Sequence, residues 1–166
     1  LPCTYSHVST CKINIMTTYT WIYTLAENID QNALEADFAA FLNQWQTHGT
    51  PVKGAIEVKH ARFVIVQADP SDGRPSGCSI DSMRHGVEAI LQNKNLSWLD
   101  NGMVAYKAKD DSIQVVSFRE IPSLLEAGQL GPDTTIFDNT LSQTDDLNLW
   151  ERPLRETWMK RFLVGA

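Results

Sequence analysis

The chain has 166 residues, of which 43% are hydrophobic and 20% charged, and its formal net charge is −6. This composition is typical of a globular domain and excludes wholesale disorder. An acidic chain without a basic stripe repels a phosphate backbone, so we expect no nucleic acid to bind. The length allows a hydrophobic core that needs no disulfide or metal to hold it.

Sequence signals of location point to the cytoplasm. No apolar run approaches the ~20 residues that a membrane-spanning helix requires, so we expect no membrane partner. The three cysteines are an odd number and predict free thiols in a reducing compartment, with a Cys3–Cys11 disulfide as the alternative. Residues 1–16 lack helix or strand periodicity, and Met16 is the expected native start. We therefore expect a disordered or loosely attached extension over 1–16 and a single α+β domain over 17–166.

The first predicted elements are a strand and an amphipathic helix. Residues 21–25 are aromatic, β-branched or apolar, which favours a strand. Asp30 is placed to cap a helix, and apolar residues recur at helical spacing from Leu34 to Trp45. Gly49, followed by Pro51, predicts the end of this helix.

Two strands and a second helix follow. Residues 55–59 alternate between apolar and charged side chains, and residues 63–66 form a continuous apolar run that is typical of a central strand. These two segments form either a hairpin or one long bent strand. Turn-forming residues over 69–77 predict a loop. From about Ser79 to Asn93, apolar residues recur with a helical period.

The last third of the chain contains a hairpin, two short elements and a tail. Strands over 103–106 and 113–118 are joined through Asp110-Asp111. A short helix over 123–127 and a short edge strand over 134–137 come next. The tail is predicted to be a helix that packs its aromatic stripe onto the sheet, with an exposed patch for a partner as the alternative. The stripe consists of Trp150, Leu154, Trp158 and Phe162.

In this order the elements define an α+β fold, with a mainly antiparallel sheet, two main packed helices and a helical C-terminal tail. The first six elements match the β-α-β-β-α-β order of a ferredoxin-like core.

The chain contains the strings Trp21-Ile22-Tyr23, Trp45-Gln46-Thr47-His48-Gly49, Arg62-Phe63, Ser76-Gly77-Cys78-Ser79-Ile80-Asp81, Phe137-Asp138-Asn139 and the tail residues Trp150, Pro153, Trp158 and Arg161-Phe162-Leu163. Together they resemble a family of small uncharacterised bacterial proteins whose members often carry the label "ABC transporter ATPase". The resemblance extends over nearly everything after Met16, is most specific at residues 76–81, Ser-Gly-Cys-Ser-Ile-Asp, and implies no established activity. ATP hydrolysis by such a cassette needs a G-x-x-x-x-G-K-[ST] loop to hold the phosphates. The chain has no such string, so we expect no ATPase activity.

Cys78 is the strongest candidate for chemistry. It lies at or just before the start of the second helix, where free amides and the helix dipole can activate a thiol. A nucleophilic thiol also requires a base within hydrogen-bond reach, and we predict His48 or His60 for this role. His85 is excluded because seven helical residues separate it from Cys78 by about 10 Å along the axis.

The same loop predicts a binding site for a small anionic ligand. Successive amides around Gly77 can hold a phosphate or carboxylate without a base or a thiolate. The structural alternative is that Cys78 is a small buried residue and that Ser76 or Ser79 simply caps the helix. The predicted ligand-binding residues are Arg74, Ser76, Gly77, Cys78, Ser79, Asp81 and Arg84.

We expect no metal and no cofactor, because the histidines and cysteines show no spacing such as C-x-x-C or H-x-x-x-H. The favoured function is a non-catalytic module that binds a small anionic molecule or a protein partner through Pro75 to Asp81, and that can form a homodimer. A thiol-dependent enzyme with Cys78 as its nucleophile is the alternative.

Overall fold

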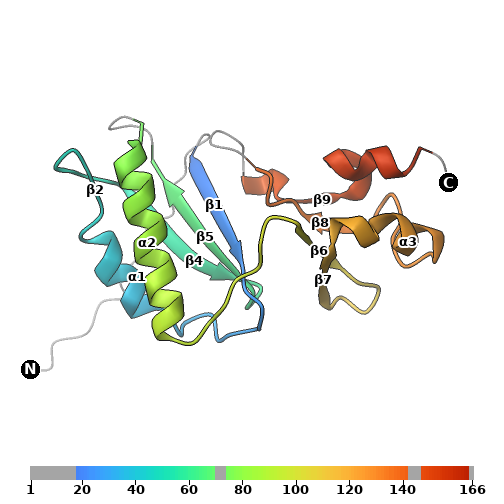
Figure 1. Ribbon diagram of the computed structural model, residues 1–166, viewed down its shortest axis with the longest axis horizontal. Helices are drawn as coiled ribbons and strands as arrows, with labels where there is room; N and C mark the ends of the chain where they lie inside the picture. Colours follow the sequence, from blue (N-terminus) through green and yellow to red (C-terminus); the bar gives the residue numbers. More distant parts are fainter. Residues whose placement is uncertain (1–17, 70–73, 142–146, 165–166) are drawn as a thin grey trace, which may run out of the picture.

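The computed structural model describes residues 18–69, 74–141 and 147–164. The extension predicted over 1–16 and the Cys3–Cys11 alternative lie outside the described residues, as do 70–73 of the predicted loop. The described chain combines helices with antiparallel sheets (Figure 1), which confirms the α+β class.

The first half of the chain forms a three-stranded sheet with two helices on one face (Figure 1). Its strand order is β1-β5-β4, and β5 pairs antiparallel with both neighbours. The connection from β1 through α1 to β4 is therefore a split β-α-β unit. In chain order the elements are β1 (Tyr19–Thr24), α1 (Glu35–Leu42), β2 (Gln46–Thr47), β3 (Thr50–Pro51), β4 (Gly54–Lys59), β5 (Phe63–Ala68) and α2 (Gly77–Asn93).

The second half forms a four-stranded antiparallel sheet in the order β7-β6-β8-β9. Its helix α3 and its C-terminal 3-10 helices lie at the right of Figure 1, away from α1 and α2. The elements are β6 (Met103–Lys107), β7 (Ile113–Ser117), η2 (Phe118–Glu120), α3 (Ile121–Glu126), β8 (Thr135–Phe137), η3 (Leu147–Leu149), β9 (Glu151–Pro153), η4 (Leu154–Glu156) and η5 (Trp158–Phe162).

Strand β5 is buried on both faces. Because side chains alternate along a strand, Val64 and Val66 enter the core under the two helices, whereas Phe63 and Ile65 enter a second core shared with the other sheet. All four side chains are 0% exposed. The apolar run thus correctly predicted a central strand. Strands β4 and β5 form a hairpin rather than one bent strand.

The β4–β5 hairpin closes through two non-glycine residues with positive φ, His60 at 52° and Ala61 at 56°. The closing pair is Lys59 with Phe63, so the turn contains three residues, 60–62. It places His60 against the rings of Phe63, Phe137 and Trp150, at centroid distances of 6.4, 5.4 and 5.8 Å. The turn is therefore held by aromatic contacts with Phe63 of β5 and with Phe137 and Trp150 of the second half.

The ferredoxin-like core is not confirmed. Residues 103–107, which were expected to supply its last strand, form β6 and pair with β7 and β8 in the second sheet. The first sheet consequently has the strand order of such a core without its fourth strand.

The first helix ends at Leu42, earlier than predicted. Trp45 leaves the helix to fill the first core, where it is 1% exposed. The next residues form the small hairpin β2–β3, whose turn residues His48 and Gly49 both have positive φ. Asp30 does not cap this helix, because its carboxylate accepts a hydrogen bond from the Asn32 amide at 2.8 Å.

Two predictions for the second half were wrong. Strand β8 lies between β6 and β9 and is not an edge strand. The tail is not one helix, since it forms β9 and two 3-10 helices separated at Thr157, whose hydroxyl accepts from the Met159 amide. The expected packing of the tail is confirmed for Trp150, which is 1% exposed and lies in the core between the sheets.

Within the described segments, none of the helices is both long and apolar enough to cross a membrane.

The two helices of the first half touch at Gly86. A Cβ atom added there would lie 2.3 Å from Cε2 of Phe41, which is far inside van der Waals contact. We expect Gly86→Ala to lower the free energy of unfolding by about 1 kcal/mol. Overpacking against Phe41 destabilises the fold by about 1–3 kcal/mol, and the higher helix propensity of alanine offsets about 1 kcal/mol of this. Urea denaturation measures this value. Gly77→Ala is the matched control, since no atom lies within 4 Å of its added Cβ; equal stability of the two variants would contradict the expectation.

Candidate functional site

The connection after α2 starts to pair with β1 and then turns away. The Leu99 amide donates to the Thr24 carbonyl at 2.8 Å, and the Ala26 amide donates to the Ser97 carbonyl at 2.9 Å. Leu25 and Trp98 form an isolated antiparallel bridge. Residues 97–99 thus lie where the first residues of a fourth strand would pair with the end of β1. Beyond Leu99 the chain leaves for the second sheet.

The rest of the outer edge of β1 therefore has no strand beside it in the described part of the chain. In the antiparallel pair with β5, every second residue of β1 directs its backbone groups outward. Thr24 is one of these residues, because it accepts from Leu99, so Thr20 and Ile22 are the others. The described residues supply no hydrogen bond to the amide or carbonyl of either one. The amides and carbonyls of these two residues thus lack a hydrogen-bond partner among the described residues, and Thr20 as a whole residue is 4% exposed.

A cavity of about 460 Å³ runs along the free edge, and we call it the β1 groove. Residues 20–23 of β1 form its base, and the exposed side of α2 forms one wall. The opposite wall consists of the 98–101 connection together with Asn139 and Leu141. A second cavity of about 210 Å³ adjoins the groove and shares Ile22 with it.

Aromatic rings cover the side of the groove that faces α2. Tyr19 and Trp21 stack at a centroid distance of 6.4 Å, and Tyr23 meets Trp98 edge to face at 6.2 Å. Each of these four side chains is only partly buried. Aromatic surfaces of this kind supply large contact areas to a ligand with little loss of side-chain entropy.

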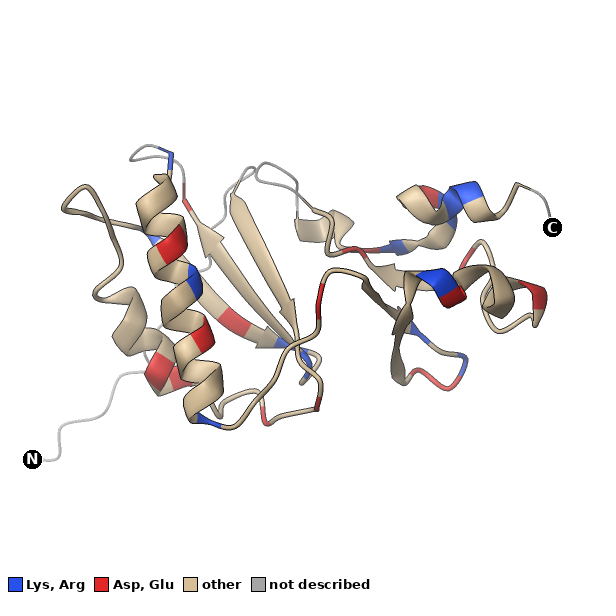
Figure 2. Cartoon of the chain, in the orientation of Figure 1, with Lys and Arg blue, Asp and Glu red and all other residues tan. Residues whose placement is uncertain are grey.

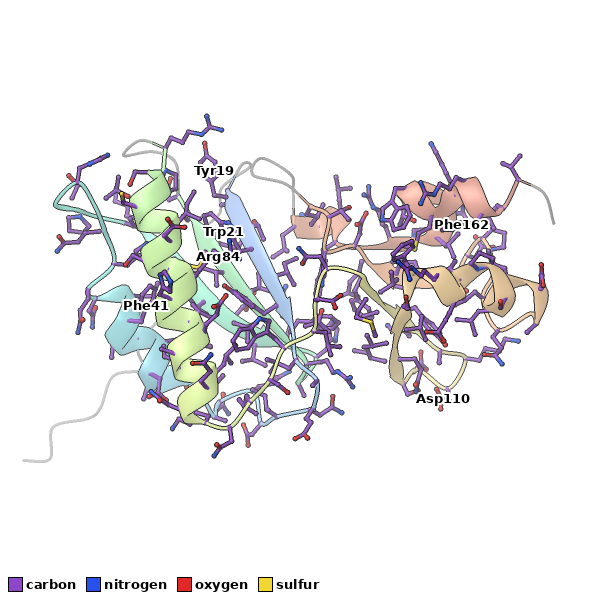
Figure 3. The ribbon with its side chains drawn as sticks, in the orientation of Figure 1. Tyr19, Trp21, Phe41, Arg84, Asp110 and Phe162 are labelled. Atoms are coloured by element: carbon purple, nitrogen blue, oxygen red, sulfur yellow. The ribbon has the colours of Figure 1, made fainter. Side chains whose placement is uncertain are left out.

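Helix α2 places one residue of each charge on the groove. Ile80, Arg84 and Glu88 recur every four residues and so lie on one face of the helix. Figure 2 shows acidic and basic positions alternating along α2, and Figure 3 shows Arg84 projecting between α2 and β1 near Trp21. No ion pair joins Arg84 to Glu88 among the residues that the structure describes. The Arg84 side chain instead hydrogen-bonds to the Tyr23 phenol, and both charges line the groove.

The wall opposite α2 is held by a polar network. The Asn139 amide group donates to the Thr24 hydroxyl at 2.8 Å and accepts from the Trp150 indole at 3.0 Å. The adjacent Asp138 carboxylate is 2% exposed and pairs with the Arg152 guanidinium. A buried carboxylate with such partners fixes its loop, because removing one partner would leave an uncompensated charge. Asn139 is thus anchored on this side of the groove by hydrogen bonds to β1 and to Trp150.

The structure settles the capping question at the start of α2. The Ser76 hydroxyl accepts from the Ser79 amide at 3.1 Å, and the Ser79 hydroxyl donates to the Ser76 carbonyl at 2.8 Å. Ser79 is 2% exposed, whereas Gly77, Cys78 and Asp81 are exposed. Cys78 is therefore not a buried packing residue, contrary to the structural alternative, and its thiol is free.

The other predicted site residues lie in different places. His48 and Arg74 line a cavity of about 290 Å³ near the start of α2, together with Lys53 and Asp69. His60 lies at the β4–β5 turn, where its ring nitrogen is 2.5 Å from a carboxylate oxygen of Glu151. Among the described residues no hydrogen bond joins either histidine to the Cys78 thiol, so the role of a base for Cys78 stays a prediction. Arg84 alone of the predicted set lines the β1 groove.

Sequence reasoning missed most of the groove. The alternation of Tyr19, Trp21 and Tyr23 was a detectable signal, because it places three rings on one face of a strand. Glu88 carried no such signal. The described residues contain no cluster of three or more His, Cys, Asp or Glu side chains that could hold a metal ion.

Comparison with known proteins finds no matching family model, no matching curated protein and no matching solved structure. The resemblance to the bacterial family therefore stays a prediction, and the site must be interpreted from its own chemistry.

Tyr23 reports on the groove through its ionisation. Burial raises the pKa of Tyr23 from 10.0 to about 12, with the Glu88 carboxylate adding to the rise and the Arg84 charge opposing it. The folded state thus favours the neutral phenol, and the stability from this preference is present below pH 10 and is lost as the pH rises through about 12. We expect unfolding free energy to fall less steeply over this range in Tyr23→Phe than in the native sequence. Identical pH profiles would contradict the assignment.

Proposed function

We propose that the protein is a non-catalytic protein-interaction module that binds an extended segment of a partner along the outer edge of β1. The observation that carries this proposal is the pair of residues, Thr20 and Ile22, whose backbone groups face the β1 groove without a partner strand. A bound segment would become the fourth strand of the first sheet.

Strand addition is a recurring mode of peptide recognition. Main-chain hydrogen bonds give affinity, and pockets for alternate side chains give specificity. The β1 groove offers both, because a free strand edge forms its base and an aromatic, charged helix face forms one wall. A groove between an edge strand and a helix confines the added segment on one face.

The composition of β1 supports the same conclusion. Edge strands of monomeric proteins are normally protected by a lysine, a proline, a bulge or a covering element. The sequence of β1 is Tyr-Thr-Trp-Ile-Tyr-Thr and contains none of the residues that protect an edge. Its pairing with β5 is also regular, with no bulge over residues 19–24. The strand therefore has the properties of one that receives another strand.

A small-anion site near the start of α2 is the second candidate function. The cavity lined by His48, Lys53 and Arg74 gathers basic side chains from two parts of the chain, although Asp69 also lines it. Thermal shift with inorganic phosphate tests this candidate: stabilisation that is lost in Arg74→Ala supports it, and no shift contradicts it. The thiol-dependent enzyme stays a prediction that rests on the exposed Cys78.

Hydrogen exchange tests strand addition at the edge itself. The Thr20 and Ile22 amides should exchange faster in the free protein than the amides directed at β5, and a bound heptapeptide should slow them at least roughly tenfold, the factor expected for one new backbone hydrogen bond. The Trp21 and Tyr23 amides point toward β5, so they are slow from the start and serve as the internal control. The probe is a pool of heptapeptides in which threonine alternates with varied residues.

A proline variant tests whether binding is lost when one outward-facing amide of β1 is removed. Thr20→Pro removes one outward donor and no bond to β5, and proline is tolerated at such edge positions. We expect it to fold and to bind the pool at least roughly tenfold more weakly. Thr20→Val retains the amide while losing the hydroxyl, so it should bind normally. Equal binding by the two variants, each shown to be folded by circular dichroism, would contradict strand addition.

A further inference from the structure

Building on the proposed function, we infer that the bound segment runs antiparallel to β1 and carries the pattern basic–x–acidic–x–apolar from its N-terminal to its C-terminal end. Three residues of α2 that line the β1 groove determine this pattern: Glu88, Arg84 and Ile80. The direction is set by the stretch of chain that already pairs with β1.

The direction follows from residues 97–99. They pair antiparallel with the end of β1, through the Leu25–Trp98 bridge and the bond from Leu99 to Thr24. A segment that continues their line along β1 has the same direction and begins beside Asp100, where the chain turns away. Antiparallel ladders are also slightly more stable per residue than parallel ones. The segment would end near Tyr19.

The spacing of α2 matches the spacing of an added strand. Residues four apart in a helix are separated by about 6 Å along the axis. Side chains two apart in a strand are separated by about 6.6 Å and lie on the same face. Alternate side chains of the bound segment therefore have the same spacing as Glu88, Arg84 and Ile80. Each of these three residues faces one side chain of the segment.

The order of these contacts is fixed by the ends of the groove. Glu88 acts on the ionisation of Tyr23, whose ring contacts Trp98, so Glu88 lies near the end of β1 where Asp100 is found. At the other end the Arg74 guanidinium lies 5.9 Å from the ring of Tyr19, just before α2 begins. An antiparallel segment thus meets Glu88 first, Arg84 second and Ile80 third. Charge complementarity requires a basic, an acidic and an apolar side chain in that order.

Two occupants from this chain fit the pattern poorly. A second copy that pairs through its own β1 would present Tyr-Thr-Trp-Ile-Tyr-Thr, which carries no charge for Glu88 or Arg84. Residues 1–17 contain no aspartate or glutamate to meet Arg84. The groove therefore favours a segment of a different protein.

Three labelled peptides test the pattern with the full chain by fluorescence anisotropy. The first, Thr-Lys-Thr-Glu-Thr-Val-Thr, carries the inferred order. The second exchanges its lysine and glutamate, and the third replaces both with glutamine. We expect the first to bind roughly tenfold more tightly than the second, with the third between them, as two partly exposed charge pairs would give.

A charge exchange in the protein provides the reciprocal test. The double variant Arg84→Glu with Glu88→Arg should reverse the preference, so that the second peptide binds more tightly than the first. The matched control exchanges Glu57 and Lys59, an ion pair of 3.6 Å on β4 at the opposite edge of the sheet. This control should keep the original preference. A preference that is unchanged in the Arg84 and Glu88 variant would overturn the inference.

The outcomes separate this inference from the proposed function. If all three peptides bind equally and slow the Thr20 and Ile22 amides, strand addition stands and the charge pattern is wrong. If no peptide binds and none slows these amides, both are wrong. Concentration-dependent dimers in sedimentation, abolished by Thr20→Pro and insensitive to the peptides, would overturn the inference in favour of a second copy as occupant.

Discussion

The burial of β5 on both faces is the constraint on which the rest of the structure depends. A sheet that is covered by helices on one side alone can leave its other face in water, but Phe63 and Ile65 make that face too apolar to be exposed. The second sheet covers it, with Phe137 and Trp150 packed against Phe63 at 4.8 and 4.9 Å. Each such aromatic contact adds to the burial of a large apolar area. The two halves of the chain thus share one core.

This requirement also explains why β1 has no strand along its outer edge among the described residues. The residues after α2 begin to pair with β1, yet the next strand, β6, is used in the second sheet, where Ala105 contributes to the shared core. One strand cannot complete the first sheet and cover its face at the same time. The protein covers the face, and the unused edge becomes the base of the β1 groove. The candidate site is therefore a consequence of how the core is closed.

The sequence predicted those elements whose pattern is local. The apolar run of β5, the helical stripe of α2 and the hairpin of β6 with β7 could be identified because burial follows the period of each element. The C-terminal tail could not, since the stripe from Trp150 to Phe162 has helical spacing while its residues serve two different cores. The groove was also hidden, because a free edge depends on which strands pair. Only Arg84 was named in advance, and for a different site.

An uncharged and regular edge strand makes a protein without a bound partner prone to aggregation. The row of outward amides and carbonyls on β1 can accept any extended chain, including a partly unfolded neighbour, so an empty groove is a starting point for aggregation. A resident ligand would block that route and would shift the folding equilibrium toward the native state by mass action. Under the proposed strand addition, the solubility of the chain would therefore depend on the supply of its partner.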